Sequence, residues 1–249
     1  MERLGGGTEK TGLWRIALPD KEQSQHLLKR TGVVLTRKNT PDGDSSALLF
    51  LKERGAVWVS VPGASRGSQR FGGALEPLVW GHFQLYQSRR RMYVREIEVQ
   101  DDFWGLRRLP RAMAQALRWA KLLQSRLIEG YPQDDILTLF YWALKAVLDG
   151  TDPEIVHCRF LWRWLQSWGV APSFDVCSEC GAPLNGSGTW ADGSFMCRRC
   201  SQTEDVIEFD EFAHYAASNR FVPEKITPRL LKQARSIADL LLKNLDENK

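Results

Sequence analysis

Four of the five cysteines stand in two Cys-x-x-Cys pairs, a spacing typical of metal-binding modules. The first pair is Cys177 and Cys180, the second is Cys197 and Cys200, and 16 residues separate the pairs. Two tight turns of this kind present four thiolates tetrahedrally to one zinc ion. Because sulfur then fills every coordination position, no place remains for water or substrate. We therefore predict one structural zinc ion per chain and no catalytic metal.

Two arginines, Arg198 and Arg199, lie inside the second pair. Four thiolates and one Zn²⁺ carry a net negative charge, which these cations can offset. They can equally face a nucleic acid, and the sequence favours neither role.

No other motif in the chain indicates an enzyme. There is no Gly-Lys dipeptide, so the phosphate-binding loop GxxxxGK[ST] is absent. The four histidines stand in neither an HExxH nor a GxSxG context, and neither His82 nor His157 heads the His-x-Glu motif of a zinc-dependent deaminase. We expect a non-enzymatic protein, with a zinc-dependent enzyme acting on nucleic acid as the disfavoured rival.

The net charge of +4 conceals a strongly basic segment. Residues 30–126 contain 17 Lys or Arg against 8 Asp or Glu, whereas the rest of the chain contains 17 against 22. Clustered cations bind phosphate backbones because counterions are released, so this segment is a candidate polyanion-binding face. A solvated basic surface is the alternative. The candidate DNA-binding residues are Arg66, Arg70, Arg89, Arg90, Arg91, Arg95, Arg107, Arg108 and Arg111.

Most of these arginines fall on or between expected strands. We expect five strands, at 31–38, 45–52, 56–62, 75–87 and 90–100. These segments are rich in β-branched, aromatic and other apolar residues, and turn signals lie between them. Five short strands in about 70 residues fit a small closed barrel, because closure removes exposed sheet edges. On the fourth strand Phe83 and Leu85 share one face, while Trp80 and Tyr86 share the other. Barrels of this kind bind single strands with a cationic groove and stacked aromatic rings.

After Asp101 the apolar period becomes helical. Pro110, Pro132 and Pro153 each open a run with apolar residues at spacings of three and four, and a glycine follows each run. Two further helical runs are expected at 206–218 and 224–245. These helices can pack as a bundle, and Cys158, on the apolar stripe of one of them, is expected in its core.

Length and composition favour a globular protein of one or two domains. The chain has 249 residues, of which 43% are apolar and 26% are charged. No window approaches about 18 consecutive apolar residues, and the first ten residues lack the apolar core of a secretory signal. We expect a cytoplasmic protein.

Several short motifs occur in the order typical of the RecO family of bacterial recombination mediators, which the chain resembles through most of 31–220. They are GVVLTR at 32–37, Asp44, Leu48-Leu49-Phe50, Gly55, Gly63-Ala64 and Gly73-Ala74-Leu75-Glu76-Pro77. The helical segment and the four-cysteine module of many family members are similar to 110–169 and 177–200. The chain departs from the family pattern at Gly63-Ala64, which Pro62 precedes and Ser65 follows, with Arg66 shifted by one position.

Residues 1–29 have no obvious counterpart in the family; they contain a Gly triplet and no sustained apolar period, so we expect an irregular extension there. The resemblance implies an α+β protein with two further parts. Residues 30–103 are a five-stranded OB-fold barrel that binds nucleic acid, and 104–249 are a helical domain with the zinc module inserted at 174–203. It further implies a non-enzymatic recombination mediator that binds single- and double-stranded DNA and anneals complementary strands. Such a protein acts with a RecR-type partner to load RecA onto strands covered by single-stranded-DNA-binding protein. Its location would be cytoplasmic, bacterial and nucleoid-associated, with no membrane partner. The alternative is a zinc-ribbon nucleic-acid-binding adaptor in transcription or translation.

The resemblance also implies that the helical half receives the acidic, apolar C-terminal tail of single-stranded-DNA-binding protein. Arg118 and Lys121 are the candidate contacts, because they stand beside Leu117, Leu122 and Leu123 on the first expected helix. The alternative is that these leucines are core residues and the two cations are solvated.

Overall fold

The computed structural model describes residues 14–15, 27–39, 44–61, 71–89, 91–201, 203–218 and 220–247. The chain divides into two compact units, which are Met1–Phe103 with Ala120–Asp134, and Trp104–Trp119 with Asp135–Lys249. A sheet comes first along the chain and helices follow it, so the expected mixed α+β class is confirmed.

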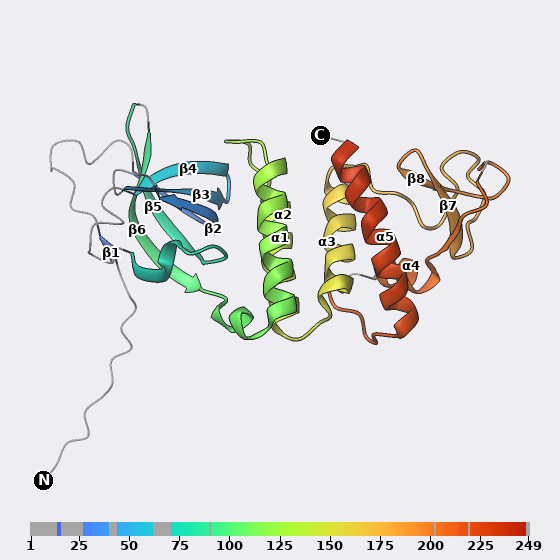
Figure 1. Ribbon diagram of the computed structural model, residues 1–249. Helices are drawn as coiled ribbons and strands as arrows, with labels where there is room; N and C mark the ends of the chain where they lie inside the picture. The colour runs from blue at the N-terminus through green and yellow to red at the C-terminus, as the bar shows by residue number, and fades with distance from the viewer. Residues whose placement is uncertain are drawn as a thin grey trace, which may run out of the picture. The chain divides into compact units, whose positions relative to one another are not determined.

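The first unit is built on a mainly antiparallel sheet (Figure 1). Its strands are β1 (Trp14–Arg15), β2 (Leu27–Asn39), β3 (Ser45–Leu51), β4 (Gly55–Val61), β5 (Trp80–Gln87) and β6 (Met92–Asp101). Strand β2 pairs with β3 and β5, β3 with β4, and β5 with β6, all antiparallel. Strand β6 also pairs with β4 in parallel through Ser60 and Tyr93, so the pairings return to their start. Strand β2 begins ahead of the expected start at 31, and β1 lies within the extension that was expected to be irregular.

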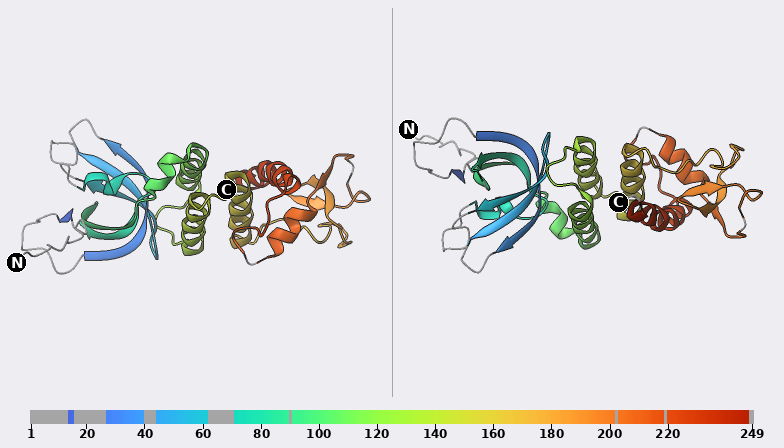
Figure 2. Two further views of the ribbon diagram at one scale, coloured as in Figure 1. Left: turned by 90° about the horizontal axis from the view of Figure 1, so that it is seen from below. Right: turned by 90° about the horizontal axis from the view of Figure 1, so that it is seen from above.

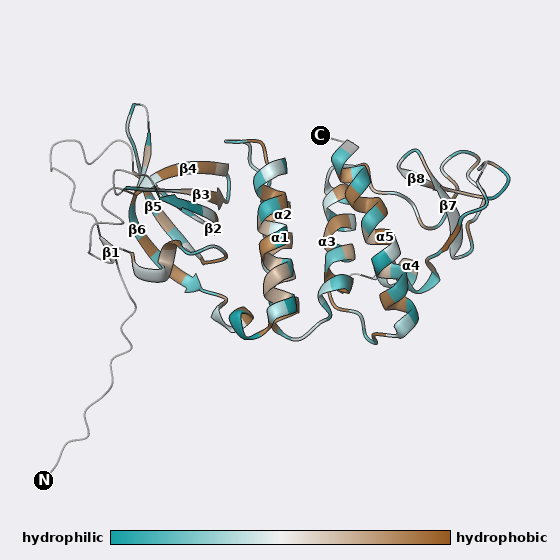
Figure 3. Cartoon of the chain, in the orientation of Figure 1, coloured by the Kyte–Doolittle hydropathy of each residue, from teal (hydrophilic) through white to brown (hydrophobic). Residues whose placement is uncertain are grey.

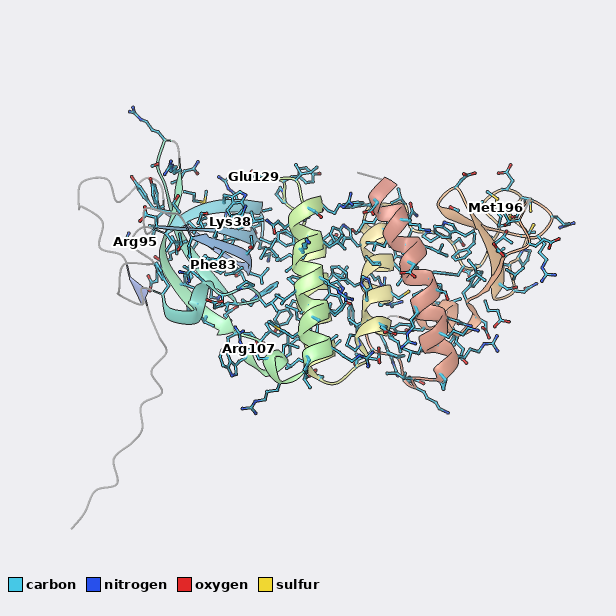
Figure 4. The ribbon with its side chains drawn as sticks, in the orientation of Figure 1. Lys38, Phe83, Arg95, Arg107, Glu129 and Met196 are labelled. Carbon is cyan, nitrogen blue, oxygen red and sulfur yellow. The ribbon has the colours of Figure 1, made fainter. Side chains whose placement is uncertain are left out.

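Alternate residues of these strands face one apolar core. Phe83 (labelled in Figure 4) and Leu85 on β5 are fully buried in this core, while Tyr86 on the opposite face is partly exposed. Strand β2 passes very close to β3 at Gly32, where an added Cβ would lie 2.1 Å from the carbonyl oxygen of Phe50. Only glycine allows this approach of two backbones.

The expected strand at 75–87 is wrong over its first residues. A 3₁₀ turn, η2 (Gly72–Leu75), occupies its start, and β5 begins only after Leu78, whose φ is +76°. Pro77 has no N–H to donate to a strand pairing, and a left-handed residue cannot continue a ladder. The apolar pattern arises because Leu75 is buried in the core without belonging to a strand.

A loop from the helical part of the chain is attached to this sheet. Residues 120–134 belong to the first unit. Ala56 on β4 forms a parallel bridge with Glu129 and accepts a hydrogen bond from the N–H of Gly130 at 2.9 Å. The N–H of Glu53 donates to Oδ1 of Asp134 at 2.8 Å. These bonds connect positions about 75 residues apart in the chain.

The second unit is mostly helical. Its elements are η3 (Trp104–Arg108), α1 (Pro110–Arg126, shared with the first unit), α2 (Asp134–Leu148), α3 (Pro153–Ser167), α4 (Asp210–Ala217), α5 (Pro228–Glu247) and the strands β7 (Ser187–Ala191), β8 (Ser194–Met196) and β9 (Val206–Glu208). Helix α5 packs along α3 and α4 (Figure 2). Apolar and polar colours alternate along α5 in Figure 3, as an amphipathic helix requires. Its buried side includes Ala234, Ile237 and Leu241.

Two of the three helix starts agree with the proline signals in the sequence, and the third helix, α2, begins at Asp134, two residues after Pro132. Helices α1 and α3 begin at Pro110 and Pro153, and the side chain of Asp152 accepts a hydrogen bond from the N–H of Glu154 at 2.9 Å. This N-cap satisfies one of the free donors at the start of α3. None of the described helices has the length and apolarity that a membrane span requires.

The expected helix at 206–218 is wrong at its start. Its first residues form β9, in which Val206 and Ile207 pair with Thr189 and Gly188 of β7. Both are β-branched residues, which favour strands, and the neighbouring hairpin supplies the ladder. Helix α4 then begins at Asp210.

Candidate metal centre and nucleic-acid interface

The four cysteines of the two pairs converge on one point. The Sγ atoms of Cys177, Cys180, Cys197 and Cys200 all lie within 4.8 Å of one another. The Sγ atoms of Cys180 and Cys197 are 3.8 Å apart. Cys177 is buried, whereas the other three are at least partly accessible. This cluster has the composition and spacing to bind a metal ion.

Local backbone turns shape the cluster. After the first pair, Gly181 adopts a φ of +70° and donates its N–H to the carbonyl of Cys177 at 2.9 Å. After the second pair, the N–H of Ser201 donates to the carbonyl of Cys197 at 3.1 Å. The N–H of Cys197 donates to the Sγ of Cys177 at 3.3 Å, so that the two pairs are joined directly.

Backbone N–H donors lower the pKa of two of the four thiols, those of Cys177 and Cys197. Hydrogen bonds from the backbone N–H of Cys180, then of Cys197, lower the pKa of Cys177 to about 6. The backbone N–H of Cys200 is the main cause that lowers the pKa of Cys197. The pKa of Cys200 is raised to about 12, because its thiol shares hydrogen bonds with Cys180 and then Cys197. Four clustered thiolates repel one another, and a divalent cation is the species that allows all of them to ionise.

An aromatic cluster supports the cysteine module. Phe195 of β8 lies 4.5 Å from Phe209 and 5.3 Å from Phe174, measured between ring centroids. Phe174 also contacts Phe212 of α4 at 5.3 Å. The amide of Asn244 on α5 donates to the carbonyl of Gly193 in the β7–β8 turn at 2.9 Å. The module therefore packs against α4, which follows it along the chain, and is hydrogen-bonded to α5, which is remote from it in sequence.

The candidate DNA-binding arginines of the sheet are only partly described. Arg89 and Arg91 are exposed in the turn between β5 and β6. Hydrogen bonds between Ser88 and Arg91 close this turn. Arg95 lies on β6 and is partly exposed (Figure 4). Arg66, Arg70 and Arg90 lie outside the described residues.

One cation that the sequence analysis did not single out lies on the same sheet. The Nζ of Lys38 on β2 is 4.8 Å from the ring centroid of the half-buried Trp58 on β4. This pair joins a positive charge to an aromatic face. The sequence contains no local signal for it, because the two residues are brought together through β3.

The remaining candidate arginines fall into two environments. Arg107 and Arg108 are exposed on η3, and the guanidinium carbon of Arg107 lies 4.5 Å from the ring centroid of Trp104. Arg111 on α1 is directed instead to Asp152 and Glu154, with N–O distances of 3.5 Å to each. Trp104 is 59% exposed and was missed by sequence reasoning, although a tryptophan shortly before an Arg-Arg pair was a usable signal.

Comparison with known proteins places this arrangement in a family. Residues 109–209 match the family model described as "Recombination protein O C terminal", a segment that contains all four clustered cysteines. A DNA repair protein RecO of Rubrobacter xylanophilus is 31% identical over 179 residues, which cover 70% of this chain and 71% of the relative. The chain belongs to the RecO family. A DNA repair protein RecO of an Exiguobacterium species is 28% identical over 188 residues, or 74% of each chain. As a RecO family member, the protein is assigned to DNA repair.

The RecO-type helices contain the residues expected to hold a partner peptide. Arg118 and Lys121 on α1 are exposed, and Leu117 beside them is 40% exposed. Leu123 is fully buried, so this leucine is a core residue and does not contribute to an exposed groove. Of these three leucines, Leu117 and the partly buried Leu122 are therefore the ones that can make an apolar contact on this face.

Two titratable groups in the helical core of this RecO protein have structural roles. His157 accepts a hydrogen bond at Nδ1 from the indole N–H of Trp119 at 3.0 Å. Burial, and then the charge of Arg118, lower the pKa of His157 to about 4, so its ring is neutral. Cys158 is fully buried, as expected, and burial raises its pKa well above the ordinary value.

Proposed function

We propose that this protein is a non-enzymatic recombination mediator that binds single- and double-stranded DNA and anneals complementary strands. The observation that carries the proposal is the set of exposed arginines, Arg89, Arg91, Arg107 and Arg108, on a member of the RecO family. Phosphate contacts from such side chains bind strands without reading their sequence. They also screen the repulsion between two strands that must approach each other to anneal.

We further propose that the sheet of the first unit is an OB-fold barrel. The closed circuit of pairings from β2 through β3, β4, β6 and β5 supports it, as does the single apolar core that these strands enclose. An OB-fold offers one curved face to single strands. The Lys38–Trp58 pair on β2 and β4 has the chemistry that such a face uses, a cation beside a ring.

We propose that the four-cysteine cluster holds one structural Zn²⁺. A tetrahedron with zinc–sulfur distances of about 2.3 Å has edges of about 3.8 Å, which equals the separation of the Cys180 and Cys197 sulfur atoms. With Cys177 and Cys200 as the other ligands, sulfur surrounds the ion completely. Zinc bound there would crosslink the two turns, and the lack of an open position supports a structural role over a catalytic one.

An annealing assay tests the main proposal. The protein is mixed with two complementary oligonucleotides without nucleotide or added metal, and duplex formation is followed by energy transfer between end labels. We expect annealing to be faster than the spontaneous reaction and to leave the strands intact. Absence of acceleration at protein concentrations that saturate DNA binding would contradict the mediator proposal, and strand cleavage would contradict the non-enzymatic one.

In the cell, we propose that the protein acts in the cytoplasm at the nucleoid with a RecR-type partner, and that it helps RecA load onto strands covered by single-stranded-DNA-binding protein. The exposed pair Arg118 and Lys121, next to Leu117, supports contact with the acidic, apolar tail of that covering protein. We expect Arg118→Ala/Lys121→Ala to weaken binding of a labelled tail peptide at least tenfold. The matched control, Lys232→Ala/Lys243→Ala, removes two cations from α5 and should bind as the wild type does. Equal affinity of both variants would remove α1 from the proposed peptide site.

A further inference from the structure

The short helix η3 presents an exposed indole with a cation stacked on it. Trp104 is 59% exposed, although the Arg107 guanidinium lies over its ring with its carbon 4.5 Å from the centroid. Side chains three residues apart eclipse each other in a 3₁₀ helix, which has three residues per turn. The geometry of η3 therefore holds this pair together and leaves a large part of the indole accessible.

The backbone below the pair is held in place. Leu106 is fully buried, and its carbonyl accepts a hydrogen bond from the N–H of Leu109 at 2.9 Å. An added Cβ at Gly105 would lie 2.7 Å from Cδ1 of Leu148, so the backbone of η3 packs directly against the last turn of α2. Trp104 and Arg107 thus project from a fixed support, and little conformational entropy is lost when a ligand binds them.

The charges around the pair favour an anionic ligand. Arg107 and Arg108 are both exposed, and η3 itself contains no acidic residue. In the part of the chain that the structure describes, neither arginine has a carboxylate partner, whereas Arg111 two residues into α1 has Asp152 and Glu154. Two guanidinium groups beside an accessible ring match a nucleotide, which offers a flat base and a phosphate.

We propose that Trp104 is a base-stacking residue for single-stranded DNA, with Arg107 and Arg108 on the phosphates that flank the stacked base. The inference rests on the proposed DNA-binding function and goes beyond it by naming a contact with the base itself. Stacking on an indole is available only to a base outside a duplex. The site therefore distinguishes single strands from duplexes, which phosphate contacts alone do not.

Two oligonucleotides of equal length test the stacking step. One is an ordinary single strand and the other carries abasic positions, so both have the same phosphates but only the first has bases at every position. We expect Trp104→Ala to weaken binding of the ordinary strand about fivefold or more and to leave the abasic strand and the duplex within twofold of the wild type. Trp104→Phe retains a ring and should recover part of the affinity. An Arg107→Ala/Arg108→Ala variant should instead weaken both strands and reduce the slope of log affinity against log salt by roughly 0.7 for each phosphate that is no longer neutralised.

Matched controls separate the possible failures. Trp142 on α2 is also exposed, at 53% of its surface, and no described cation lies over its ring. The Trp142→Ala variant should therefore bind both strands as the wild type does. Melting temperatures within about 2 °C of the wild type should show that each variant is folded. If the wild type binds DNA and Trp104→Ala binds the ordinary strand equally well, the stacking role is refuted while the proposed function stands. An equal loss on the ordinary and abasic strands also refutes stacking, and a wild type that binds no DNA refutes the proposed function itself.

Discussion

Replacing Arg159 with methionine should destabilise the helical unit strongly. Arg159 on α3 is fully buried, and its guanidinium donates to four backbone carbonyls at and beyond the C-terminus of α4: those of Tyr215, Ala216, Ser218 and Arg220. These carbonyls lie at the negative end of the α4 dipole, so they provide the counter-charge that a buried cation needs. Burial lowers the pKa of Arg159 to about 10, and the side chain therefore stays charged at pH 7.

The expected magnitude follows from the hydrogen bonds that the variant cannot form. Two of the bonds are short, including 2.6 Å to Ala216, and two are long at 3.2 Å. Hydrogen bonds to a charged group contribute roughly 1.5–3 kcal/mol each, so the two short bonds set a loss of about 3–6 kcal/mol. Methionine fills part of the volume and reduces the net loss to about 3 kcal/mol. For a chain of this size, that loss lowers the melting temperature by roughly 6–12 °C.

Thermal and urea unfolding measure this loss, with Arg163→Met as the matched control. Arg163 lies one turn later on α3, where its guanidinium donates to the side chain of Gln166 at 2.8 Å and lies 5.5 Å from the ring centroid of Trp162. These contacts are nearer the surface than those of Arg159, so the replacement should cost less than about 1 kcal/mol. Hydrogen exchange should show reduced protection around 215–220 in Arg159→Met alone. If Arg159→Met is as stable as Arg163→Met, the assignment of Arg159 as the clamp on α4 is wrong.

Three more outcomes are expected. Removal of metal with a chelator, or Cys177→Ser, should lower the melting temperature and the hydrogen-exchange protection of 174–208, because bound metal supplies folding energy to this module; elemental analysis showing well under one zinc per untreated chain would contradict the zinc proposal. His157 has a pKa of about 4 when folded and about 6.5 when unfolded, so its neutral form is favoured by folding. The contribution of neutral His157 to the free energy of unfolding should be fully present above pH 6.5 and should fall by about 3 kcal/mol as the pH drops from 6.5 to 4. The His157→Asn variant should lack this pH dependence in urea titrations, and a pH profile equal to that of the wild type would contradict the assignment to His157. Arg89→Ala/Arg91→Ala should weaken DNA binding and reduce the salt slope by roughly 0.7 per phosphate on single strands; an unchanged slope would mean that this turn is merely solvated.

The sequence determined the features that depend only on residues close together in the chain. The spacing of the cysteines predicted a single cluster, because each Cys-x-x-Cys turn closes locally around its own hydrogen bonds. Prolines predicted the starts of α1 and α3, since a proline suits the first helical turn, where its missing N–H has no partner in any case. Alternation on β5 correctly predicted that Phe83 and Leu85 share the face opposite Tyr86.

Local pattern failed where a contact from a distant segment decided the outcome. Residues 206–208 have helical neighbours, yet they form β9 because β7 supplies a ladder. Leu75 is apolar because it fills the core, although its backbone is in a 3₁₀ turn. Burial produces the same apolar signal whatever the backbone conformation is, so periodicity alone cannot separate these cases.

The roles of Arg111 and Arg159 were decided by tertiary structure alone. The sequence places Trp104 three residues before Arg107, but it shows Arg111 and Arg159 only as arginines on helices, with nothing local to separate them. In the folded chain one lies over an exposed indole, one pairs with two carboxylates, and one is buried against the end of α4. Composition determines how much positive charge the chain carries, but the contacts between segments determine which charges remain available to a ligand, because only folding sets their neighbours and their burial.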